Sequence, residues 1–147
     1  MIIRWPGKTK PGTVTDGLMS QIDIMATIAA IVGVELQPGT AEDSFDQREL
    51  WMGGNSQRRS LVHNTKPNHF AVREGDWLLI EGKSGGVSRV PEWFNQANDY
   101  ATNSFETALY NLSEDLPQRR NLTEEQPEKV SQLRVLLEHK RSHGEVR

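Results

Sequence analysis

At 147 residues, the chain is long enough to fold around a buried core. Hydrophobic residues make up 35% and charged residues 25% of it, which is polar for a globular domain but is not the apolar-poor mixture of a disordered chain. The net charge of −3, from 17 basic and 20 acidic residues, does not supply the basic surface of a nucleic-acid-binding protein. The absence of cysteine excludes disulfides, thiolate metal sites and cysteine nucleophiles.

No apolar run approaches the roughly 20 residues that a helix needs to cross a bilayer. The opening residues Met1 to Pro6 hold no apolar segment followed by a small-residue cleavage site. We therefore expect no membrane partner, no nucleic-acid partner and no signal peptide in this chain, and the compartment stays open.

The first third of the chain predicts one strand and one helix. Ile2 to Trp5 is a short β-like run that ends at a Pro-Gly pair. From Ser20 to Val32, apolar residues recur at helical spacing, and Gly33 stands where the residue after a helix belongs. Glu35 to Gly54 is a turn-rich loop with room for one helical turn near Gln47 to Met52. Because a strand must pair with a neighbour, the opening run indicates further strands outside this chain.

The middle of the chain predicts antiparallel strands. The β-like runs cover residues 60–63, 70–73 and 77–81, and Glu74-Gly75-Asp76 is the turn that makes the last two a hairpin. Gly82 to Ser104 is aperiodic, and a loop of that length in a compact domain usually serves a function.

The last part of the chain predicts one more strand and a well-marked helix. Leu109 to Leu112 forms the strand, and Pro127 fits the first position of the helix. The helix carries one apolar stripe, formed by Val130, Leu133, Leu136 and Leu137. The expected fold class is therefore α+β, with a small antiparallel sheet covered by a C-terminal amphipathic helix.

Six short blocks stand in order along nearly the whole chain. They are Ile3 to Gly7, Asp16-Gly17-Leu18, Ile22 to Thr27 leading into Gly33-Val34, Ala41 to Ser44, Phe70 to Trp77, and Leu109 to Leu112 followed by Asn121-Leu122. Each block is weak alone, but their shared order and spacing are hard to obtain by chance. In this order they resemble the downstream part of type I sulfatases, the arylsulfatase and arylsulfatase A-like family of the alkaline-phosphatase-like superfamily.

The resemblance implies that the chain spans parts of two domains. Residues 1–56 would be the tail end of the large catalytic α/β domain, with its last strand, a buried helix and long loops. Residues 57–147 would be the C-terminal sulfatase subdomain, with the antiparallel strands and the C-terminal helix.

The resemblance also implies that the catalytic groups lie upstream of this segment. The family hydrolyses sulfate esters with a formylglycine, made from Cys or Ser in a Cys/Ser-x-Pro-x-Arg motif, beside a divalent cation, calcium, held by oxygen ligands. The nearest match here, Asp115-Leu116-Pro117-Gln118-Arg119, has aspartate where the oxidisable residue must stand. We therefore expect no catalytic residue, no metal ligand and no cofactor in this chain.

Four residues are candidates for a weak substrate-binding role: His63, Asn64, Lys66 and Arg73. The resemblance implies a histidine facing the substrate cleft near His63, and the nearby cations would form an anion-binding rim. The alternative is a strand-end histidine beside solvated surface charge. Relatives commonly have a lysine where Leu78 stands, which puts any charge contact from that position in doubt.

The leading functional interpretation is a C-terminal part of an arylsulfatase-like sulfuric-ester hydrolase that lines the cleft but is inactive alone. Its partner would be a missing or separately encoded catalytic half, as in a split sulfatase. The alternative is a non-enzymatic module that binds sulfated carbohydrate through His63, Lys66 and Arg73. In isolation, an unpaired strand and an apolar helix also predict self-association.

Overall fold

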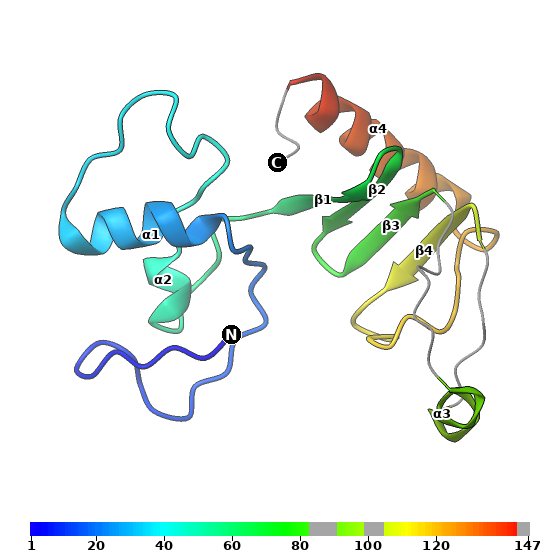
Figure 1. Cartoon of the computed structure of the whole chain (residues 1–147), viewed down its shortest axis with the longest axis horizontal. Helices are drawn as coiled ribbons and strands as arrows, with labels where there is room; N and C mark the ends of the chain where they lie inside the picture. The colour runs from blue at the N-terminus through cyan, green and yellow to red at the C-terminus, as the bar shows by residue number, and fades with distance from the viewer. Residues whose placement is uncertain (83–90, 99–104, 144–147) are drawn as a thin grey trace. The chain divides into compact units, whose positions relative to one another are not determined.

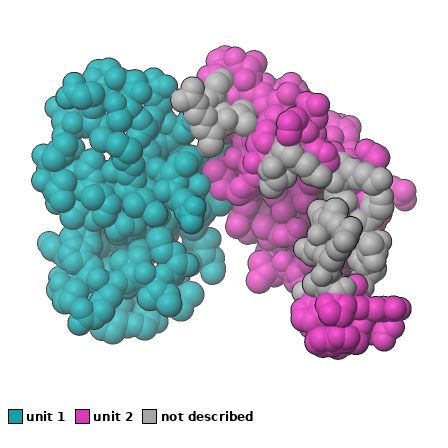
Figure 2. All heavy atoms as spheres, in the orientation of Figure 1, with its two compact units in different colours: residues 1–60 teal, residues 61–147 magenta. Residues whose placement is uncertain are grey.

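A computed structural model describes residues 1–82, 91–98 and 105–143, apart from the side chains of Thr65 and Lys66. These residues divide into two units, one within residues 1–60 and one within 61–147, which Figure 2 distinguishes by colour. Within the described residues, no helix is both long and apolar enough to cross a membrane.

The first unit contains two helices, α1 (Asp23–Val32) and α2 (Arg48–Trp51) (Figure 1). Both agree with the sequence prediction, although α1 begins three residues after the expected Ser20. Gly33 ends α1 in the left-handed conformation, with φ 71°, and the backbone N–H of the cap donates to the Ala29 carbonyl. Glycine is favoured at this position because it has no Cβ to collide with the preceding turn.

The predicted strand from Ile2 to Trp5 is not formed. The run pairs with no strand in the described part of the chain, and the Ile2 side chain is 98% exposed. A strand is stabilised only by a neighbour that accepts and donates its backbone hydrogen bonds, and no described segment supplies one here.

The second unit contains a four-stranded sheet in the order β1-β2-β3-β4. The strands are β1 (Ser60–Lys66), β2 (His69–Glu74), β3 (Trp77–Glu81) and β4 (Thr107–Asn111). The β2–β3 and β3–β4 pairs are antiparallel, with Val72 opposite Leu79 and Leu79 opposite Leu109. The short helix α3 (Glu92–Asn98) lies inside the segment for which the sequence predicts only a loop, so that prediction was wrong at these residues.

Helix α4 (Pro127–Ser142) lies across one face of the sheet (Figure 1). The side chains that meet there are Val62, Val72, Leu79, Leu109, Val130, Leu133 and Leu137, all buried. The predicted stripe therefore packs as expected, with Leu136 partly buried at its margin. The α+β fold class is confirmed.

The opposite face of the sheet carries a second apolar cluster. Its buried members are Leu78, Ala108 and Tyr110, and Ala71, Ile80, Phe105 and Leu112 pack against them. Because side chains alternate along a strand, β2, β3 and β4 each contribute to both clusters.

Candidate functional site

Two of the four predicted site residues lie together on the sheet face opposite α4. Val62 and Val72 pack under α4, so the next residues, His63 on β1 and Arg73 on β2, point to the other face. β1 and β2 are neighbouring strands, and the charge of Arg73 acts on His63. Arg73 also lies opposite Leu78 in the ladder, which places the pair beside the second apolar cluster.

The pKa of His63 lies below its ordinary value of 6.5. The larger cause is the removal of water from the ring by surrounding atoms, and the positive charge of Arg73 is the second. The residue still has an exposed surface, so a ligand can reach it. At neutral pH the ring is therefore largely uncharged, and Arg73 is the cation of the pair.

The guanidinium of Arg73 is held in place by one backbone contact. Its Nε donates a hydrogen bond to the Gly75 carbonyl oxygen at 2.9 Å, which ties it to the β2–β3 turn. Among the described residues, no carboxylate forms an ion pair with Arg73. Its remaining N–H groups can therefore donate to an anionic oxygen without displacing a protein carboxylate.

The other two predicted residues are not brought to this pair. Asn64 follows His63, so strand alternation turns it toward the face that α4 covers, where it is exposed. Lys66 ends β1, but its side chain lies outside the part of the chain that the structure describes. Leu78, at the position of the expected lysine, is buried in the second apolar cluster.

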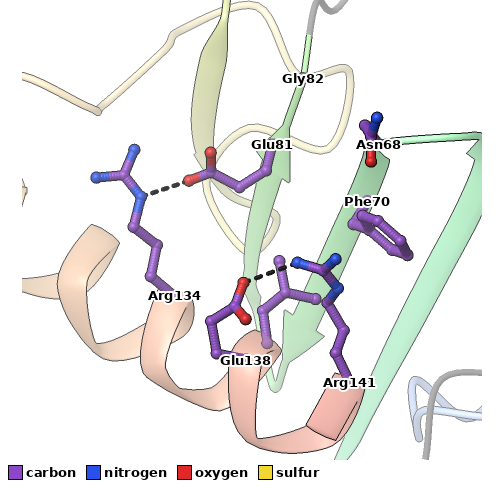
Figure 3. A pocket seen from close by; sticks show the side chains of 8 residues that line it. Asn68, Phe70, Glu81, Gly82, Arg134, Glu138 and Arg141 are labelled. Carbon is purple, nitrogen blue, oxygen red and sulfur yellow. Dashed lines mark hydrogen bonds and ion pairs between the residues drawn. The ribbon is translucent and has the colours of Figure 1, made fainter. Parts of the chain in front are cut away.

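A pocket of about 270 Å³ lies between α4 and the end of the sheet where β2 begins and β3 ends (Figure 3). Its lining includes two cations, but each is paired: Arg134 Nε donates to Glu81 at 2.6 Å, and Arg141 Nη1 donates to Glu138 at 2.8 Å. The Arg141 guanidinium also lies 4.4 Å from the centroid of the Phe70 ring. Because each cation is neutralised by a neighbouring carboxylate, this pocket is a weaker anion site than Arg73.

The most buried polar cluster lies in the first unit and was not predicted. The Asp23 side chain is fully buried, and Arg58 binds it through two hydrogen bonds, Nη2 to Oδ1 at 2.5 Å and Nε to Oδ2 at 2.9 Å. Arg58 also donates to the Asp43 carbonyl at 2.6 Å and lies over the Phe45 ring. The Thr27 hydroxyl donates to the Asp23 carbonyl.

Both carboxylate oxygens of Asp23 accept hydrogen bonds within this cluster. Burial alone would raise the pKa of its carboxyl, but hydrogen bonds from Arg58 and from the backbone N–H groups of Ser20 and Phe45 outweigh it. The pKa therefore lies below the ordinary value, and the group is an ionised structural carboxylate at neutral pH. Because both of its oxygens already accept hydrogen bonds in a buried site, it is not a candidate for acid–base catalysis or metal binding.

The described residues do not fit the catalytic groups that the resemblance implies. No three histidine or carboxylate side chains within them are grouped as metal ligands. Asp115, in the motif-like segment, instead holds a turn, since its Oδ2 accepts the Arg120 N–H at 2.7 Å. No chemical step is therefore assigned to formylglycine or calcium in this chain.

Comparison with known proteins gives matches along nearly the whole chain. The N-acetylgalactosamine-6-O-sulfatase of Bacteroides thetaiotaomicron is 32% identical over 138 residues, which are 93% of this chain and 26% of that protein. The human arylsulfatase A is 34% identical over an alignment of 127 positions, and the match covers 80% of this chain and 24% of that protein. The chain thus spans about a quarter of the length of the curated relatives that it matches.

Comparison of the fold with solved structures indicates the same family. A solved Bacteroides thetaiotaomicron structure, described as 6S-sulf from a locus for the metabolism of multiple glycosaminoglycans, matches 96% of this chain and 28% of its own. The two superpose with a TM-score of 0.75 at 31% sequence identity. No protein-family model matches the sequence. The resemblance drawn from the ordered sequence blocks is confirmed, and the chain belongs to the sulfatases as a C-terminal portion of their fold.

Proposed function

We propose that this chain is the C-terminal part of an arylsulfatase-like sulfuric-ester hydrolase, and that it lines the substrate cleft without hydrolysing the ester alone. The observation that carries the proposal is the 32% identity to the N-acetylgalactosamine-6-O-sulfatase across 93% of this chain and only 26% of that protein. A match of that length supports a shared fold segment rather than a shared motif. The nucleophile and the cation would come from the other three quarters of the fold.

Within this proposal, the His63–Arg73 pair contacts the sulfated substrate. Arg73 offers a guanidinium without a carboxylate partner among the described residues, and a planar guanidinium can donate two parallel hydrogen bonds to a sulfate group. His63 offers an uncharged ring that can donate or accept one hydrogen bond. Neither residue is assigned a role in breaking the ester bond. Lys66 and Asn64 remain further candidates for substrate contact.

A chimaera tests the hydrolase proposal. The matching segment of the Bacteroides N-acetylgalactosamine-6-O-sulfatase is replaced by this chain, and release of sulfate from N-acetylgalactosamine 6-sulfate is measured. We expect turnover by the chimaera and none by the chain alone, with or without calcium. A soluble, folded chimaera without turnover would refute the hydrolase proposal. Turnover by the isolated chain would refute the proposal that the chain is inactive alone.

The substrate-contact role has a separate test in the same chimaera. Arg73→Gln should raise KM roughly 10- to 150-fold with a smaller effect on kcat, since removing a charge-assisted hydrogen bond costs about 1.5–3 kcal/mol. Arg59→Gln is the matched control, because Arg59 is an exposed cation of the first unit. Equal KM values for the two variants would show that Arg73 does not contact the substrate.

The second candidate function is a stand-alone module that binds sulfated carbohydrate. It is favoured by the same Arg73, which has no carboxylate partner within the described chain and lies at the surface beside the exposed His63. Titration calorimetry of the full chain with a sulfated oligosaccharide tests it. Binding that Arg73→Gln abolishes would favour the module, and no binding at millimolar ligand would exclude it.

The remaining part of the hydrolase could lie on the same polypeptide or be encoded separately. A coding sequence immediately upstream that contains a Cys/Ser-x-Pro-x-Arg motif would favour either a longer enzyme or a split one. Co-purification of the two products would then identify the split form.

A further inference from the structure

Two of the four histidines of the chain lie side by side at the end of helix α4. His139 is in the last turn of the helix, His143 is its C-cap residue, and both are exposed. Their ring centroids are 4.2 Å apart, with an angle of 41° between the ring planes. Residues four apart project from the same side of a helix, so the period of α4 brings these rings together. The proposed hydrolase function uses neither ring.

Hydrogen bonds determine which ring nitrogen of His143 is free. Its Nδ1 lies 2.8 Å from the His139 carbonyl oxygen, and because a carbonyl can only accept, we assign the ring proton to Nδ1. The Ser142 Oγ lies 3.1 Å from the same nitrogen and already donates to the His139 carbonyl at 2.8 Å, so it also acts as an acceptor. The lone pair of the neutral ring is therefore on Nε2, on the opposite side of the ring.

A metal-binding histidine is usually held in the same way as His143. Such a ligand donates its second ring N–H to a carbonyl or carboxylate, which fixes the tautomer and orients the free nitrogen. We propose that His139 and His143 form a two-histidine chelate, here called the α4 metal site, for a divalent first-row transition metal such as zinc. The α4 metal site does not depend on the proposed hydrolase function.

The distance between the two rings suits a single ion. Zinc binds imidazole nitrogen at about 2.0–2.1 Å, so two nitrogens on one tetrahedral ion lie roughly 3.3 Å apart. Rings with centroids 4.2 Å apart can reach that separation by small rotations about their side-chain bonds. Within the described part of the chain, no hydrogen bond holds the His139 ring, so this ring can turn toward an ion.

The positive charge near the two histidines is directed away from them or neutralised. Lys140 and Arg141 stand between them in the sequence, but residues one or two positions away point to other sides of a helix. The Arg141 guanidinium donates to Glu138 at 2.8 Å and lies over the Phe70 ring. The last carbonyl groups of a helix carry partial negative charge, which favours a cation at this end of α4.

The two imidazole donors determine which metals can bind. Imidazole nitrogen suits zinc, copper and nickel, whereas calcium and magnesium take oxygen ligands. The α4 metal site therefore differs in kind from the calcium site that the resemblance implies upstream of this segment. Among the described residues, no third histidine or carboxylate is grouped with the pair, so water or a donor from a ligand would complete the coordination.

Nuclear magnetic resonance of the histidine rings tests the proposal on the full chain without an affinity tag. The ring C–H signals of all four histidines are followed as zinc chloride is added. We expect the His139 and His143 signals to move together and to saturate at one zinc ion per chain, while those of His63 and His69 stay in place. Calcium chloride should move none of the four.

Substitutions test whether both rings bind the same ion, with the affinity measured by titration calorimetry. His139→Gln and His143→Gln should each weaken zinc binding at least about tenfold, since even the loss of an outer-shell partner costs 10- to 100-fold. The double variant should bind little more weakly than either single variant, because a chelate is lost when one ligand is removed. His69→Gln, which changes a histidine of strand β2, is the matched control and should leave the affinity unchanged.

The thermal midpoint in the presence of EDTA should be the same for wild type and the two single variants of α4, because both histidines are exposed. A loss of zinc binding would then not be a loss of folding. Three results would each overturn the proposal: no saturable binding at millimolar zinc, equal shifts of all four histidines, or an unchanged affinity in either single variant.

Discussion

Removing the Arg58 side chain should unfold the first unit. Arg58→Ala leaves the Asp23 carboxylate buried, with only its contacts to the Ser20 and Phe45 N–H groups and to the Gln47 side chain. The side chains of Arg58 and Asp23 are 6% and 0% exposed, so the carboxylate has little contact with bulk solvent. Breaking a buried ion pair in this way costs about 3–5 kcal/mol.

That cost is comparable to the whole stability of the unit. At about 0.05–0.15 kcal/mol per residue, a segment of roughly 60 residues has about 3–9 kcal/mol. Hydrogen exchange read by peptide mass spectrometry resolves the two units separately. We expect α1 peptides to lose protection in Arg58→Ala, while β3 peptides of the second unit keep theirs. Arg59→Ala is the control and should change the free energy of unfolding by less than about 0.5 kcal/mol, because Arg59 is exposed.

The destabilisation caused by Arg58→Ala should change with pH in a defined direction. The folded-state pKa of Asp23 lies below its ordinary value of 3.8, so the stability that its charge contributes is present above that value and is lost as the pH falls through the folded pKa. Without Arg58 the pKa of Asp23 rises, because burial then has less opposition. The penalty of Arg58→Ala should therefore shrink toward acid pH. A penalty that is absent at pH 7, or that grows on acidification, would refute the ion-pair reasoning.

Three further predictions concern the packing and the candidate site. Leu133→Asp should unfold the second unit in a thermal melt, since Leu133 is fully buried against the sheet, whereas the exposed Val135→Asp should not. Gly17→Ala should destabilise the first unit because the new Cβ collides with the Leu50 side chain. In a Leu50→Ala background, the same substitution should lower the free energy of unfolding, measured by urea denaturation, by much less. The pKa of His63, measured by NMR, should lie below 6.5. Arg73→Gln should raise that pKa, because it removes the positive charge that is one of the two causes of the lowered value. An unchanged pKa would mean that the two side chains are not close.

The strands and the C-terminal helix of the second unit could be predicted because the sequence patterns that indicate them are local. Strand β3 begins at Trp77 and ends at Glu81 as predicted, since the Glu74-Gly75-Asp76 turn determines where the hairpin reverses. Helix α4 begins at Pro127, a residue suited to the first helical position, and its apolar stripe matches the helical period. Helix α3 was missed because seven residues are too few for a periodic pattern to be recognised.

The first unit was harder to predict because its contacts are not local. The two members of its central ion pair are 35 residues apart, and no pattern near Arg58 distinguishes it from its neighbour Arg59. The available signal was Asp23 itself, which is the only charged residue in α1. Periodicity correctly predicted that α1 is a helix, but it could not indicate that the polar side of α1 would face inward.

The two units differ in what holds them together. In residues 1–60, all of which are described, Ala29 and Leu50 are the buried hydrophobic residues, whereas the core of the second unit contains a continuous apolar cluster between sheet and helix. The first unit relies on the polar contacts of Asp23 and Arg58. A buried ion pair adds little net stability, because the desolvation of the charges offsets most of their attraction. The hydrophobic effect therefore contributes less to the stability of the first unit than to the stability of the second.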